Sequence, residues 1–176
     1  MVTAERIEKT TLKNLIHNED YTRKVLPFLK SEYFDDRHER IVFSEIQKFI
    51  SQYNKRPTKE TLQIDLGKRK DLNEDEYKQI VSLITSLNPE DVDLDWLVNT
   101  TEKFCKDRAV HNAVMEGIHI LDGKDKKHTP EAIPSILSDA LAVSFDTHIG
   151  HDYLNQTDER YDYYHKEEER LKFDLS

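Results

Sequence analysis

Apolar residues recur every three or four positions along most of this chain, with polar and charged residues between them. This spacing places the apolar side chains on one face of an α-helix. It predicts helices over residues 3–17, 36–53, 59–68 and 73–87, and a shorter one that Asn18 caps. Since no segment shows the strict alternation of a half-buried strand, the pattern predicts an all-α fold.

Residues that favour helix ends lie at the boundaries between these predicted helices. Pro27 should kink or shorten the second helix, and Pro57 separates the third from the fourth. Asn73 and Glu76 have the spacing of a capping box, in which each side chain accepts a hydrogen bond from the other's backbone N–H. Short joints between these helices predict a helical bundle over residues 1–92.

Residues 94–121 contain no proline and predict one long helix. At 1.5 Å per residue it is roughly 40 Å long, more than a compact domain of this size needs, so we expect it to project. Small residues recur every four positions on one of its faces, at Cys105, Ala109, Ala113 and Gly117. We expect another helix to approach closely there, because a glycine inside a helix otherwise costs about 1 kcal/mol relative to alanine.

A returning helix completes a predicted α-hairpin over residues 93–145. After a polar turn at 123–128, Thr129 and Pro130 are suited to begin a helix over about 131–143. The long helix carries a second apolar face, made of Leu97, Phe104, His111, Val114, Ile118 and Leu121. Two helices cannot cover all these faces on each other, so we expect dimerisation through the hairpin; the alternative is docking on the bundle. The predicted contacts, with a dimer mate or within the hairpin, are Cys105, Ala109, Ala113, Gly117, Leu137 and Leu141.

Residues 146–176 are highly charged, but Leu154, Tyr161 and Tyr164 recur on one side of the segment. This pattern predicts a linker helix that buries its stripe against a neighbouring subunit. The alternative is a solvated tail.

The charge and the apolar content narrow the classes of function. The formal net charge is −9, from 26 basic and 35 acidic residues, so the chain is a poor DNA binder by itself. No apolar run approaches the ~20 residues of a membrane span, and no signal peptide begins the chain, so we expect a cytoplasmic protein without a membrane partner. Cys105 is the only cysteine, which excludes an intramolecular disulfide.

Candidate chemistry is sparse. Gly117 and Gly123 have five residues between them, where a phosphate-binding loop has four, and Asp125 stands where that loop has Ser or Thr. The histidines lack the spacing of metal ligands, and the many carboxylate pairs follow from the acidic composition. The sequence therefore predicts no catalytic residue, no metal ligand and no cofactor within this chain.

Several stretches resemble the N-terminal region of the DnaB-like replicative helicases of T-even-type phages. They are residues 28–34, 96–98, 101–104, 108–109, 112–113, 132–146, 149–153 and 159–161. The resemblance covers the chain from about Asn14 onward.

The resemblance implies a helical collar above a hexameric motor ring. In this family the hairpins pair into dimers, three dimers form the collar, and the linker helix contacts the neighbouring motor domain. The motor uses ATP and Mg²⁺ to move 5′ to 3′ on single-stranded DNA. Primase and a helicase loader are the implied partners, the host cytoplasm is the implied location, and this segment is implied to be non-catalytic.

Two other interpretations remain open on sequence alone. The chain could be a stand-alone all-α helicase loader or replication adapter. It could also be an enzyme with a carboxylate or histidine site that follows no known motif.

Overall fold

The computed structural model describes residues 4–145, and all regular structure within that range is helical, which confirms the all-α prediction. The α-helices are α1 (Ala4–His17), α2 (Glu19–Val25), α3 (Arg37–Tyr53), α4 (Lys59–Gly67), α5 (Glu74–Ser86), α6 (Leu94–Leu121) and α7 (Ile133–Leu141). Three single 3₁₀ turns join them, η1 (Leu26–Phe28), η2 (Ser31–Tyr33) and η3 (Pro130–Ala132). The predicted linker helix at 146–176 lies outside the described residues.

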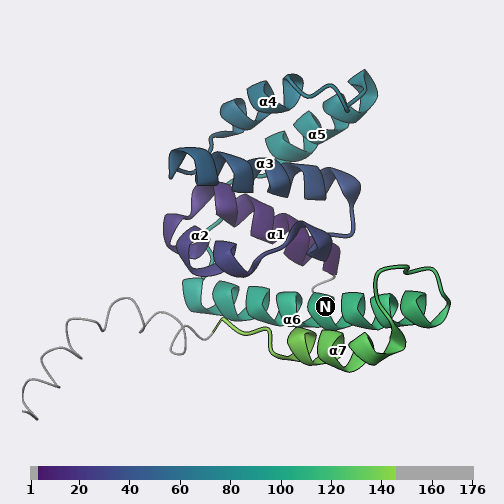
Figure 1. The fold of residues 1–176 in the computed structure, drawn as a ribbon. Helices are drawn as coiled ribbons and strands as arrows, with labels where there is room; N and C mark the ends of the chain where they lie inside the picture. Colours follow the sequence, from purple (N-terminus) through teal and green to yellow (C-terminus); the bar gives the residue numbers. More distant parts are fainter. Residues whose placement is uncertain (1–3, 146–176) are drawn as a thin grey trace, which may run out of the picture. The chain divides into compact units, whose positions relative to one another are not determined.

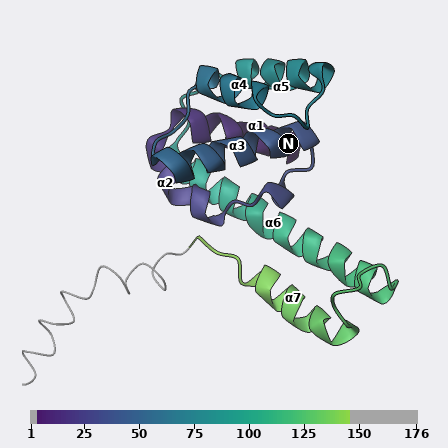
Figure 2. The ribbon, with the colours of Figure 1, turned by 45° about the horizontal axis from the view of Figure 1, so that its top comes forward.

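The helices are stacked in layers (Figure 1). α4 and α5 pack together on α3, α3 lies on α1, and α1 and α2 lie on α6. α7 packs along α6, and the turned view in Figure 2 shows α6 extending beyond the other helices with α7 beside its distal part. The described residues up to Ser144 form one compact unit, and α6 is shared between bundle and hairpin. The division into a bundle at 1–92 and a hairpin at 93–145 stays a prediction about roles.

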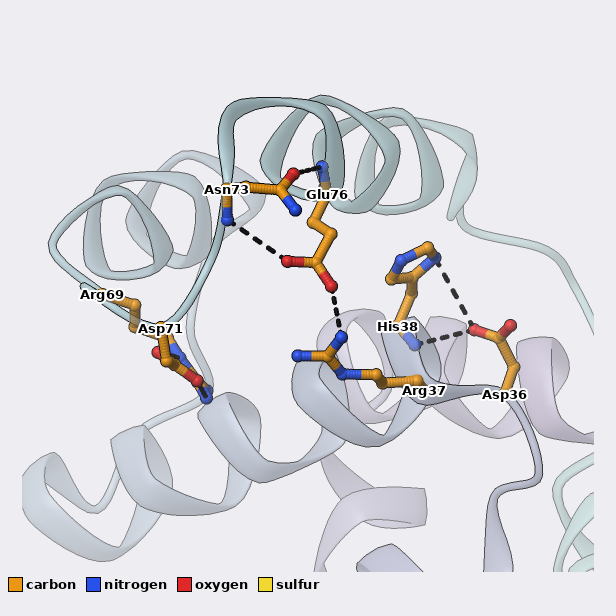
Figure 3. A network of polar contacts seen from close by, with 7 residues as sticks. All are labelled: Asp36, Arg37, His38, Arg69, Asp71, Asn73 and Glu76. Carbon is orange, nitrogen blue, oxygen red and sulfur yellow. Dashed lines mark hydrogen bonds and ion pairs between the residues drawn. The ribbon is translucent and has the colours of Figure 1, made fainter.

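Side-chain caps begin two helices at the residues predicted from the sequence. Asn18 Oδ1 accepts from the backbone N of Tyr21 at 3.0 Å, which starts α2. Asn73 Oδ1 accepts from the N of Glu76 at 2.8 Å, and Glu76 Oε2 accepts from the N of Asn73 at 3.2 Å, so both halves of the capping box are present (Figure 3). Glu76 also pairs with Arg37, which ties the start of α5 to the start of α3.

The returning helix is shorter than predicted. The chain forms the 3₁₀ turn at Pro130–Ala132 first, and α7 begins only at Ile133. Thr129 makes no side-chain capping bond. Pro134 has no N–H to donate to the carbonyl of Pro130, so a regular α-helical turn cannot form across these residues.

A buried carboxyl pair lies between α1 and α3. The side chains of Glu8 and Glu39 share a hydrogen bond, and each residue is only 3% exposed. Glu8 Oε1 also accepts from the backbone N of Asp35 at 2.8 Å, whereas Glu39 Oε2 has no hydrogen-bond partner among the described residues. The pKa of Glu39 is raised to about 7. Burial is the largest cause, and the nearby charges of Glu8 and Asp36 add to it. Lys9 opposes this shift only in part.

The raised pKa makes the stability of the fold depend on pH. The folded protein keeps the Glu39 proton up to about pH 7, whereas the unfolded chain loses it near its ordinary pKa of 4.5. The stability that this proton contributes is therefore complete below pH 4.5 and lost as the pH rises through 7. Its upper bound is about 3 kcal/mol, from 1.36 kcal/mol for each pKa unit.

We expect Glu39→Gln to stabilise the protein at pH 8 by about 1–3 kcal/mol and to change its stability much less at pH 4.5. The amide is neutral at both pH values, so only the wild-type protein has to bury a charge at position 39 at pH 8. Urea unfolding at the two pH values measures the difference. Glu32→Gln, at an exposed side chain, is the matched control and should shift stability by less than about 0.5 kcal/mol at either pH. An unchanged or lower stability of Glu39→Gln at pH 8 would mean that Glu39 is not held protonated by the fold.

Candidate assembly interface on the helical hairpin

An aromatic cluster joins α6 to the bundle. Phe34 is fully buried, stacks on Phe43 of α3 with ring centroids 5.0 Å apart, and meets the edge of Phe104 of α6 at 6.2 Å. Aromatic pairs at these distances contribute about 0.5–1.5 kcal/mol beyond their buried area. The cluster therefore fixes α6 against the bundle along its first half.

Polar contacts also hold α6 to the bundle, and together with the aromatic cluster we call them the joint. Tyr21 Oη and Thr101 Oγ1 are 2.7 Å apart in the core. Further along, Arg108 Nη1 donates to Asp35 Oδ2 at 2.8 Å, and Asn112 Nδ2 donates to the carbonyl of Glu32 at 3.1 Å.

The joint brings together three stretches that carry the resemblance. Residues 28–34 meet residues 101–104 through the aromatic rings, and they meet Asn112 through its amide. These segments are distant in the sequence, and their contacts hold α6 against the bundle.

The stripe of small residues on α6 is buried within the chain. Its members are Cys105, Ala109, Ala113 and Gly117, and none is exposed. A Cβ added to Gly117 would lie 3.5 Å from Cγ2 of Ile133, so this end of the stripe packs on α7. At the other end, burial raises the pKa of the Cys105 thiol to about 12, which leaves it protonated and unreactive at neutral pH.

The two predicted contacts on α7 differ in exposure. Leu137 is half-buried, and Leu141 is 73% exposed. Their part in an interface stays a prediction, as does that of the small-residue stripe. Leu154, Tyr161 and Tyr164, the predicted contacts of the linker, lie outside the described residues.

The second apolar face of α6 is buried where the helix lies against the bundle and exposed beyond it. Leu97 and Phe104 are buried in its first half. Beyond the bundle, apolar side chains on the same helix are open to solvent, and we call them the distal surface: Val114, Met115, Ile118 and Leu121. Leu121 is 69% exposed and Ile118 44%, although α7 lies alongside. Contiguous exposed apolar residues mark interaction sites more often than a random surface does.

The turn after α6 has the geometry of a helix end. Gly123 adopts a φ of +71°, a left-handed conformation that favours glycine directly after a helix. Its backbone N donates to the carbonyl of Ile120 at 3.1 Å, which closes the last turn of α6. Gly123 therefore terminates α6.

None of the helices within residues 4–145 combines the length and apolar character needed to cross a bilayer. No protein-family model matches the chain.

Among curated proteins, the chain is similar to the DnaB-like replicative helicase of Enterobacteria phage T4. The two sequences are 32% identical over an alignment of 172 positions, which covers 93% of this chain and 36% of the phage T4 protein. The resemblance inferred from the sequence is thereby confirmed. This chain is a relative of a DnaB-like replicative helicase over nearly its whole length, and it spans about a third of that helicase, a share consistent with an N-terminal domain.

Proposed function

We propose that this chain is the non-catalytic collar of a hexameric ATP-dependent replicative DNA helicase that acts in phage DNA replication. In this role it assembles subunits and docks partners of the primosome, primase and a helicase loader. The observation that carries the proposal is the distal surface, an apolar face that residues 4–145 leave open on a helix packed against the bundle at its other end.

The geometry of the hairpin favours assembly through copies of the same chain. The joint holds α6 by apolar, aromatic and hydrogen-bonded contacts, so the distal surface is presented on a rigid support. Isologous pairing places the same surface on both partners, and one apolar face on one rigid helix suits that arrangement. Three such dimers complete the proposed collar.

The other activities of the helicase belong, in this proposal, to the part of the relative that this chain does not cover. A motor domain there uses ATP and Mg²⁺ and contacts single-stranded DNA. The net charge of −9 supports this division, because DNA affinity depends on neutralising phosphates with basic side chains. Cys105 has the most nucleophilic type of side chain in this chain, but it is buried and protonated.

We expect the purified chain alone to show no magnesium-dependent ATP hydrolysis and to bind primase from the same phage. Hydrolysis is followed by phosphate release, and primase binding by fluorescence anisotropy of the labelled chain. Turnover that persists through purification would contradict the non-catalytic role. Binding to a separate helicase ring, without any self-association, would instead support a stand-alone loader or adapter.

A further inference from the structure

Three potential metal ligands converge at the tip of the hairpin. Glu116 lies on the last turns of α6, while Asp125 and His128 lie in the turn that follows the helix. His128 Nδ1 is 2.9 Å from Asp125 Oδ2 and 3.7 Å from Glu116 Oε1. One ligand atom from each residue lies within 4.8 Å of the other two.

These separations are close to those that one ion imposes on its ligands. With bonds of about 2.0–2.2 Å to nitrogen and oxygen, neighbouring ligand atoms of a tetrahedral or octahedral ion lie roughly 3.0–3.5 Å apart. The two distances from His128 Nδ1 fall on either side of that range. Small side-chain rotations therefore bring the three atoms onto a single ion.

The backbone of the turn holds Asp125 in place for this role. Asp125 Oδ1 accepts from the backbone N of Lys127 at 2.6 Å, which leaves Oδ2 facing His128. The backbone N atoms of Lys124 and Asp125 donate to the carbonyl of His119 at 2.9 and 3.2 Å, which fastens the turn to α6. A ligand from the helix and two from the turn thus meet on an ordered frame.

We propose that Glu116, Asp125 and His128 bind one divalent transition-metal ion, with Zn²⁺ as the representative, and that this ion fastens the hairpin turn to α6. An imidazole with two carboxylates suits Zn²⁺ and its first-row neighbours, whereas Mg²⁺ and Ca²⁺ prefer oxygen ligands alone. Neutral His128 supplies Nδ1, so any proton held there is released to solvent on binding. The two carboxylates balance the charge of the ion.

The site lies in an open cleft that admits water, and the lysines of this cleft affect which metal ion can bind. Glu116 and Asp125 line an open cleft of about 740 Å³ that reaches the bundle at Arg40, so solvent can complete the coordination shell. Lys124, Lys126 and Lys127 line the same cleft and oppose any cation. Only ions that bond strongly to nitrogen should overcome this repulsion, which favours Zn²⁺ over Mg²⁺.

The site is tested by titrating the full chain with Zn²⁺ in a calorimeter and with Co²⁺ by visible absorption. We expect one Zn²⁺ per chain, a Co²⁺ spectrum of four- or five-coordinate type, and no competition from excess Mg²⁺. Glu116→Gln, Asp125→Asn and His128→Asn should each weaken Zn²⁺ binding at least about ten-fold. Zn²⁺ should also raise the Tm of the wild-type chain and leave the Tm of His128→Asn unchanged.

The matched control is His119→Asn, because His119 lines the same cleft but is not one of the three ligands. We expect it to bind Zn²⁺ as the wild type does, and all variants to keep the wild-type helical circular dichroism. Equal loss in His119→Asn, or unchanged affinity in all three ligand variants, would place the ion elsewhere on the chain. If the wild type binds no Zn²⁺, the three residues form only an ion-pair cluster, and the proposal is wrong.

Discussion

Replacing Ile118 with Asp is expected to raise the dissociation constant of self-association at least about a hundred-fold. Ile118 lies at the centre of the distal surface, and burying such a side chain contributes roughly 1.5–3 kcal/mol. A symmetric pair carries the substitution twice, and each new carboxylate must also lose water on association. Sedimentation velocity over a range of concentrations measures the change.

Ile64→Asp is the matched control for this experiment. Ile64 is 63% exposed on α4, which lies in the layer farthest from the hairpin, so the substitution is chemically identical but off the proposed interface. At concentrations where each protein is monomeric, both variants should unfold within about 1 kcal/mol of the wild type, because both side chains are substantially exposed. If Ile64→Asp dissociates the assembly equally, or Ile118→Asp leaves it intact, the interface does not include the distal surface.

Phe34→Ala is expected to lower the free energy of unfolding by about 3–5 kcal/mol, the range for removing a fully buried phenylalanine. The ring contacts α3 through Phe43 and α6 through Phe104, so its loss leaves a cavity where the bundle meets the hairpin. Urea unfolding followed by circular dichroism gives the value.

Phe49→Ala tests whether the position, and not the residue type, determines this loss. Phe49 is half-buried on α3 and contacts the exposed ring of Tyr53 at 4.7 Å. Its removal should cost less than half as much as that of Phe34, because water reaches the site. Equal losses would show that Phe34 has no special role in joining the two parts.

Local signals allowed much of the helical framework to be predicted. The bounds of α6 agree with the prediction because Asp93 caps its start, Gly123 closes its end, and no proline lies between them. Asn18 and Asn73 cap their helices as expected, since an N-cap needs only residues three positions apart. The start of α7 was misplaced because Pro130 favours a helix start while Pro134, four residues later, prevents the first regular turn.

Contacts between residues that are distant in the sequence could not be predicted from the pattern. The spacing of Cys105 and Gly117 revealed a smooth helix face, but it did not reveal that this face would be buried within the chain, with Gly117 against α7. Glu8 and Glu39 come from different helices, and nothing local marks them as a pair.

The cluster of Glu116, Asp125 and His128 was missed for a related reason. Its spacing matches no known ligand motif, because it arises from the way the turn folds back against α6. Only the three-dimensional path of the turn brings the three side chains together.

The molar mass of the wild-type chain in solution tests the central claim most directly. It is measured by light scattering after size exclusion over a wide range of loading concentrations. Assembly through the distal surface predicts dimers, or hexamers built from them, with monomers only at the lowest concentrations. A monomer at every concentration would contradict self-assembly through the hairpin and would favour an adapter that acts on a separate helicase.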